Sequence, residues 1–181
     1  NYGLPHSGLW QVDDGNPISP SGQLSEYGDR HDTMGFYGRF NRHFNHWFKN
    51  ILWWIPDSSV PVIDASGIYR THCFDRVGAD LGLARALKIR RDVDTSYWIG
   101  LRQEARQGTR DYPGVNNGAY ILRVYDGLQS NWLEPSELLD LQTPGSGLTN
   151  SSLPVDQTFE DTEVGIRITP RAMGGSRPER W

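Results

Sequence analysis

The chain has 181 residues, of which 36% are hydrophobic, and a formal net charge of −4 at pH 7. This size leaves room for one large domain or two small ones with a packed core, and the acidic balance argues against nucleic acid as the main partner. No stretch approaches the roughly 18 consecutive apolar residues of a membrane span, and the single cysteine, Cys73, excludes an intrachain disulfide.

The first six residues, NYGLPH, match the end of a zinc-binding pattern. In H-E-x-x-H-x-x-G-x-x-H, three histidines hold zinc and the glutamate activates the metal-bound water. Gly3 occupies the place of the glycine and serves as a hinge before the ligand, because glycine tolerates a left-handed backbone. His6 occupies the place of the third ligand. The alternative is that His6 is an ordinary loop histidine.

On this alignment, the first two histidines and the glutamate would precede Asn1. The first ten residues also lack the basic start and the apolar stretch of a signal peptide. The chain is therefore expected to be either intracellular or a piece cut from a longer precursor, and the opening residues favour the second.

A second landmark lies downstream, in EYGDRHDTMGFYG (26–38). Metzincin peptidases run from the third histidine, through a loop of variable length, to a tight turn that carries a methionine beneath the zinc. Here Asp32, Met34 and Gly35 form the centre of such a stretch. The other methionine, Met173, lies in the tail.

The motif Y-G-D-x-x-D-x-M-G (27–35) resembles the Met-turn region of gametolysin-type metallopeptidases and of related immune-inhibitor-like bacterial peptidases. The resemblance implies that Met34 packs under the zinc ligands without binding the metal. It implies that Asp29 and Asp32 accept backbone hydrogen bonds in the turn or orient a ligand. Some metzincins have an oxyanion-stabilising tyrosine two residues after the methionine; here Phe36 stands there, so Tyr37 matches that role only loosely.

The resemblance also implies an extracellular zinc endopeptidase that cleaves protein or peptide substrates through a zinc-activated water. One imidazole cannot hold catalytic zinc in a site that needs three protein ligands, and without the glutamate the water has no general base. We therefore expect the chain itself to be inactive.

Other candidate sites are weaker. His43 and His46 have helical spacing but no nearby acidic or thiol partner in the sequence, which favours packing or surface roles. His31 precedes Asp32 in the turn and could approach the metal, but its spacing does not require this. His72 and Cys73 are expected to be structural residues of a strand. Asp92 and Asp94 in RRDVDT (90–95) resemble a calcium loop only faintly, because the required glycine and closing glutamate are absent; a hairpin turn is the better interpretation, and calcium stays unsupported.

Two regions differ in hydrophobic periodicity. RFNRHFNHWFKNILWW (39–54) has aromatic residues at helical spacing and predicts an amphipathic helix that ends at Pro56, followed by a linker at 56–61. From about residue 62 onward the period is two, which predicts the strands ALKIR (86–90), YWIGLRQ (97–103), AYILRVYD (119–126), ELLDLQ (137–142) and VGIRIT (164–169).

The expected fold class is α+β, with residues 1–57 as the C-terminal part of a metzincin-like catalytic domain, 62–170 as an antiparallel β-sandwich, and 171–181 as a flexible tail. An alternative function is a non-catalytic sandwich that binds glycan, protein or extracellular matrix, or a pseudopeptidase. Its candidate contacts are the aromatic residues Trp98, Tyr120, Tyr125 and Trp132, whose other expected role is to fill the core.

Overall fold

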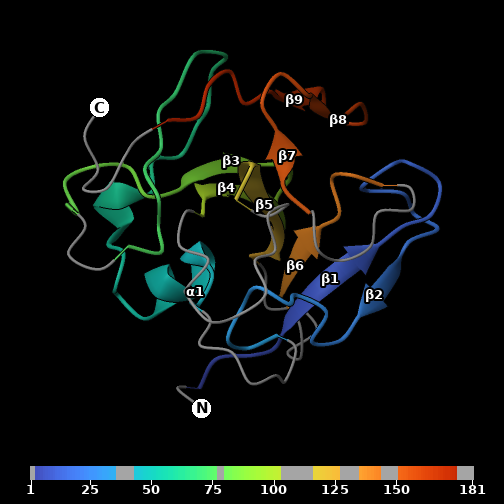
Figure 1. Cartoon of the computed structure of the whole chain (residues 1–181), viewed down its shortest axis with the longest axis horizontal. Helices are drawn as coiled ribbons and strands as arrows, with labels where there is room; N and C mark the ends of the chain where they lie inside the picture. Colours follow the sequence, from blue (N-terminus) through green and yellow to red (C-terminus); the bar gives the residue numbers. More distant parts are fainter. Residues whose placement is uncertain are drawn as a thin grey trace.

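The computed structural model describes residues 3–35, 43–76, 80–102, 116–126, 135–143 and 151–174. Within these residues the fold is mostly β, with one short α-helix (Figure 1). The elements in chain order are β1 (Ser7–Gln11), β2 (Gln23–Ser25), α1 (His46–Ile51), the 3-10 helix η1 (Asp57–Ser59), β3 (Leu87–Arg90), β4 (Thr95–Leu101), β5 (Gly118–Tyr125), β6 (Ser136–Leu139), β7 (Leu153–Pro154), β8 (Phe159–Asp161) and β9 (Ile166–Ile168).

Seven strands form the main sheet, in the order β2-β1-β6-β5-β4-β3, with β7 pairing β5. The pairs β3–β4, β4–β5 and β5–β6 are antiparallel, as the period-two pattern predicted. The pair β1–β6 is parallel, with Leu9 opposite Leu138, so the sheet is mixed. β8 and β9 form a separate two-stranded antiparallel sheet.

Side chains alternate across the central strands and supply two cores, one on each face of the sheet. Trp98, Leu122 and Leu138 belong to one core, which Phe74, Val60 and Trp47 cover from the segments around α1. The neighbouring residues Ile99, Ile121 and Leu139 belong to the other core, which Phe159, Ile166 and Ile168 cover from β8 and β9. In Figure 1, α1 and the β8–β9 hairpin accordingly lie on opposite sides of the central strands.

The helix is shorter than the sequence predicted. Asn45 caps α1, because its side-chain oxygen accepts a hydrogen bond from Phe48 N at 2.8 Å. The helix ends at Ile51, and Trp53 then has a positive φ of 59°. Among the apolar residues at helical spacing in 39–54, Phe44 and Phe48 are buried whereas Ile51 is exposed. Phe40 lies outside the described residues. No helix among the described residues is long and apolar enough to cross a membrane.

The expected boundary at residues 57–62 falls within packed structure. β1 and β2 come from the N-terminal segment, where the sequence showed no strand pattern, yet they belong to the same sheet as β3–β7. In the predicted linker, Ser59 is fully buried and Val60 lies in the first core. Of the predicted tail, residues 171–174 are exposed and 175–181 lie outside the described residues.

Candidate functional site

Gly3 and His6 lie on the segment that leads into β1. The backbone of Gly3 has a φ of +76°, in the left-handed region that favours glycine. Leu4 is buried and packs against Phe44 and Phe48, which anchors this segment beside α1. The His6 side chain is 24% exposed. It therefore lies at the molecular surface, two residues after the buried Leu4.

Both ring nitrogens of His6 have hydrogen-bond partners. Nδ1 lies 3.1 Å from Oε1 of Glu26, and Nε2 lies 2.6 Å from the hydroxyl oxygen of Tyr27. The ring centroids of His6 and Tyr27 are 3.8 Å apart, so the two rings also stack. In the β1–β2 pair, Leu9 lies opposite Ser25. Continued toward the start of β1, this register would put Ser7 opposite residue 27 and His6 opposite residue 28, so His6 lies near the chain that follows β2.

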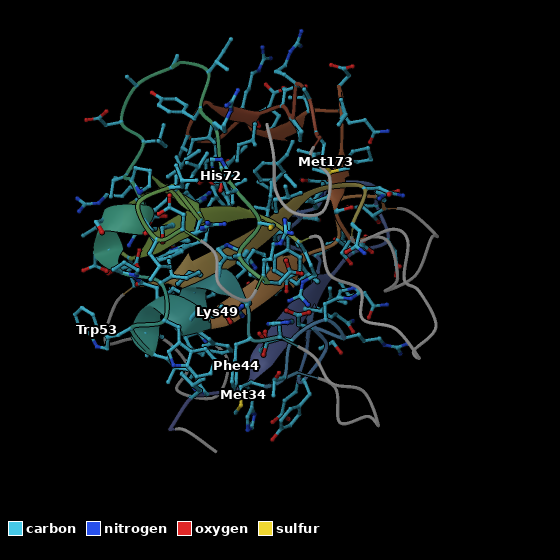
Figure 2. The ribbon with its side chains drawn as sticks, turned by 60° about the vertical axis from the view of Figure 1, so that its left-hand side comes forward. Met34, Phe44, Lys49, Trp53, His72 and Met173 are labelled. Carbon is cyan, nitrogen blue, oxygen red and sulfur yellow. The ribbon has the colours of Figure 1, made fainter. Side chains whose placement is uncertain are left out.

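The turn that carries Met34 is bonded to the residue next to His6. Ser7 N donates to Met34 O at 3.0 Å, and Asp29 N donates to Ser7 O at 3.2 Å. The Met34 side chain packs against the cluster of Leu4, Phe44 and Phe48. Figure 2 shows Met34 beside Phe44, at the opposite end of the view from Met173. The fold therefore brings the two sequence landmarks, His6 and Met34, into one region.

Asp32 and Gly35 shape this turn. The Asp32 carboxylate accepts hydrogen bonds from Met34 N at 2.5 Å and from the backbone N–H of Asn45, just before α1. A Cβ at Gly35 would lie 1.8 Å from Asp29 O, so a side chain does not fit at this position. Asp32 thus accepts backbone hydrogen bonds in the turn, one of the two roles that the resemblance implied. It also joins the turn to the start of the helix.

Asp29 connects the turn to the sheet. One of its oxygens accepts hydrogen bonds from the hydroxyls of Ser7 (3.1 Å) and Tyr120 on β5, and the other accepts from His31 N (2.9 Å). Arg102 Nη1 donates to His31 O at 2.6 Å, and its guanidinium lies over the Tyr120 ring. Asp29, Asp32 and Tyr120 are fully buried. The region is therefore a polar network enclosed by the sheet, the turn and α1.

Burial sets the protonation of this network. It raises the pKa of Asp29, and burial together with the repulsion of Asp29 raises the pKa of Asp32. Burial likewise raises the pKa of Tyr120, so its hydroxyl stays a donor to Asp29. The repulsion by Asp29 therefore favours the protonated form of Asp32.

The remaining histidines and the cysteine have packing roles. The His46 imidazole lies among the rings of Phe74, Trp98 and Tyr120, at centroid distances of 4.8, 6.1 and 5.7 Å. His43 Nδ1 lies 3.2 Å from Lys49 Nζ, which donates to Phe74 O. His31, His72 and Cys73 are buried. The backbone of Cys73 forms an isolated parallel β-bridge with that of Leu101.

The Asp92–Asp94 segment forms the β3–β4 hairpin turn, in which Asp92 accepts from Asp94 N. Among the predicted aromatic contacts, Trp98 and Tyr120 are core residues and Tyr125 is half-buried. Tyr37 and Trp132 lie outside the described residues.

A zinc ion does not fit the described residues alone. No group of three or more His, Cys, Asp or Glu side chains converges in the described ranges, and both nitrogens of His6 are engaged by Glu26 and Tyr27. Catalytic zinc takes three protein ligands. His6 is chemically suited to be one of them, and further ligands would have to come from elsewhere.

Comparison with known proteins found no matching family model, no matching curated protein and no matching solved structure. The structure instead adds residues that sequence reasoning missed: Glu26, Tyr27, Asn45, Arg102 and the pairing role of Tyr120. A signal existed only for Asn45, because Asn followed by an apolar helical run is a typical N-cap. The others act through contacts with residues distant in the chain.

Proposed function

We propose that this chain is the C-terminal part of a zinc-dependent metalloendopeptidase of the metzincin type, resembling gametolysin and the immune-inhibitor-like peptidases. His6 would supply one zinc ligand, and an H-E-x-x-H segment N-terminal to Asn1 would supply the other two histidines and the general base. The segment of residues 1–57 would carry the candidate ligand and the Met-turn. Because its strands β1 and β2 share one mixed sheet with β3–β7, it would form a single unit with residues 62–170.

The main support is the hydrogen bond from Ser7 N to Met34 O, 3.0 Å long. It joins the backbone directly after the candidate ligand to the backbone of the candidate Met-turn. Two glycine positions add to this support: Gly3, three residues before His6, has a left-handed φ of +76°, and Gly35 lies where no side chain fits. The motif G-x-x-H alone carries little weight, and this backbone hydrogen bond is the observation that adds to it.

On this proposal the 181-residue chain does not hydrolyse peptide bonds, because it lacks two ligands and the base. The intact protein would act extracellularly on protein or peptide substrates. The alternative of a glycan- or protein-binding sandwich has less support, because Trp98 and Tyr120 fill the core and Tyr125 bonds to Glu137 at 3.2 Å.

The test is to read the coding sequence upstream of the Asn1 codon and to express the longer product. We expect His-Glu-x-x-His immediately before Asn1, about one zinc per molecule by metal analysis, and cleavage of an unfolded protein substrate. His6→Ala should lose the zinc, whereas His43→Ala, which changes a histidine paired with Asp32 that is not a proposed ligand, should retain it. An upstream sequence without the two histidines and the glutamate would overturn the proposal.

A further inference from the structure

The turn that ends α1 has a tryptophan where its backbone geometry favours glycine. Trp53 N donates to Asn50 O at 2.9 Å, and Trp54 N donates to Lys49 O at 2.8 Å. These two hydrogen bonds are the pattern of a Schellman motif, in which the residue after the C-cap adopts a left-handed backbone. That residue is Trp53, with a φ of +59°. Glycine is usual here because a Cβ is costly in the left-handed region, so tryptophan is an unfavourable residue for ending the helix.

The Trp53 side chain does not offset this conformational cost by packing. It is 76% exposed, the largest exposed fraction of any aromatic side chain in the described residues. Figure 2 shows it at the edge of the molecule beside α1, pointing away from the ribbon. Ile51 and Trp54 on the same turn are 42% and 49% exposed, so the end of α1 carries an apolar surface. The fold gives no reason for a tryptophan at this position, whereas exposed apolar surfaces with a polar border mark interaction sites.

Polar groups suited to binding hydroxyls border this surface. Asn50 Nδ2 donates to Asp57 Oδ1 at 2.8 Å and to Ile55 O at 3.0 Å. The backbone oxygen of Asn50 also accepts the hydrogen bond from Trp53 N, so one residue joins the indole-bearing turn to the carboxylate. Asp57 is exposed, and its carboxylate is therefore accessible to a ligand.

The charge of the segment narrows the class of ligand. Residues 50–58, NILWWIPDS, carry Asp57 as their one charged side chain. Lys49, directly before them, is buried and donates to Phe74 O. An anionic lipid surface would meet a negative charge on this segment and no exposed cation, and insertion into hydrocarbon would bury an ionised carboxylate. A neutral sugar ring suits the segment, because its C–H face packs on an indole and its hydroxyls donate to a carboxylate.

We propose that the turn after α1 is a surface site for a neutral polysaccharide, in which Trp53 stacks on a sugar ring and Asp57, held by Asn50, accepts a hydrogen bond from a sugar hydroxyl. The site is separate from the strand aromatics Trp98 and Tyr120, which are buried. It requires neither zinc nor His6, so it goes beyond the proposed function and does not depend on it. Its role is to attach the protein to a carbohydrate surface.

Trp53→Gly separates binding from folding. It removes the indole and supplies the residue that the left-handed backbone favours, so the midpoint of urea unfolding should equal or exceed that of the wild type. Polysaccharide binding should nevertheless weaken by about tenfold or more, the effect of truncating a central tryptophan in a binding surface. Asp57→Ala should weaken binding by about three- to tenfold, as expected for the loss of one hydrogen bond.

The experiment uses the 181-residue chain and a panel of neutral polysaccharides: cellulose, chitin, xylan, mannan and β-1,3-glucan. Sedimentation with the insoluble polymers identifies the one that binds, and titration calorimetry with its hexasaccharide gives the Kd. Ile68→Ala is the matched control, because Ile68 is an apolar side chain that is 93% exposed outside this turn. It should leave the Kd unchanged.

Three results would overturn the inference. The first is that the wild type binds no polysaccharide of the panel, and the second is equal binding by the wild type and Trp53→Gly. The third is that Trp53 mediates binding to phosphatidylcholine vesicles or self-association in place of sugar binding. None of these measurements involves zinc, catalysis or the upstream sequence, so their failure is distinguishable from failure of the proposed function.

Discussion

His46 is a neutral, buried histidine at the first position of α1. Its imidazole is enclosed by Phe74, Trp98 and Tyr120, and a Cβ on Gly100 would lie 3.0 Å from its Nδ1. Burial lowers the pKa of His46 to about 3, because the charged ring would lose its hydration, and the positive charges of Arg102 and Lys49 lower it further. Its spacing to His43 resembles a metal pair, but its surroundings are aromatic.

This burial predicts an acid-sensitive contribution to stability. The unfolded chain binds a proton at His46 below the ordinary pKa of 6.5, whereas the folded chain does so only near 3. The contribution is therefore complete above pH 6.5 and is lost as the pH falls toward 3, with a slope of at most ~1.4 kcal/mol per pH unit. Urea unfolding at a series of pH values should show a smaller acid slope in His46→Leu than in the wild type. Equal slopes in the two proteins would show that His46 is charged or solvated in the folded state.

At the scale of elements, the turn from Asp29 to Gly35 has the most constrained geometry in the candidate site. It is bonded to β1 through Ser7, to β5 through Tyr120 and to the start of α1 through Asn45. Each contact comes from a different element, so the turn joins the N-terminal segment to the sheet. Its two aspartates are needed for this structural role whether or not a metal binds nearby.

A pair of glycine substitutions tests this constraint. Gly35→Ala would bring a Cβ within 1.8 Å of Asp29 O, a backbone atom that cannot move aside, and we expect a loss of about 3 kcal/mol or more in the free energy of unfolding. A Cβ on Gly3 has no atom of the described residues within 4 Å, so for Gly3→Ala we expect the cost of a left-handed backbone, about 1–2 kcal/mol. Chemical denaturation of both variants gives the comparison. Similar losses in the two variants would contradict the packing of the turn.

At the scale of the whole molecule, one sheet unites segments that the sequence divided. β1 lies between β2 and β6, and Leu9 is fully buried in the same core as Trp98, Leu122 and Leu138. The β8–β9 hairpin is fastened to the other face through Asp161, which accepts hydrogen bonds from Arg91 (2.8 Å) and from the Tyr97 hydroxyl (2.7 Å). We therefore expect the described strands to unfold as one cooperative unit.

Leu9→Ala tests that expectation. Truncating a fully buried leucine should cost about 2–5 kcal/mol, and the loss should appear in the hydrogen exchange of β4 and β5 amides as well as in β1. Leu24→Ala on β2 is the matched control, because Leu24 is 38% exposed and its truncation should cost less than ~1 kcal/mol. Unchanged protection of β4 and β5 in Leu9→Ala would instead support two independent domains divided near residues 57–62.

The sequence by itself determined part of the local structure, chiefly strands that follow residue 62. Alternation of apolar and polar side chains located β3, β4, β5, β6 and β9 within a few residues, because a strand with buried faces imposes a period of two. It also pointed to the turn at Met34, in which Asp29 accepts a hydrogen bond from His31 N and Asp32 accepts one from Met34 N.

Only the tertiary structure decided the parallel pairing of β1 with β6, the burial of His46 and the contact of Asp29 with Tyr120, which are 91 residues apart. Such contacts depend on which segments meet in space, and a short window of sequence does not encode that. The Glu26–His6–Tyr27 contact has the same origin, because the pairing of β1 with β2 brings His6 near the chain that follows β2. The role of His6 as a zinc ligand remains a prediction that the upstream sequence will test.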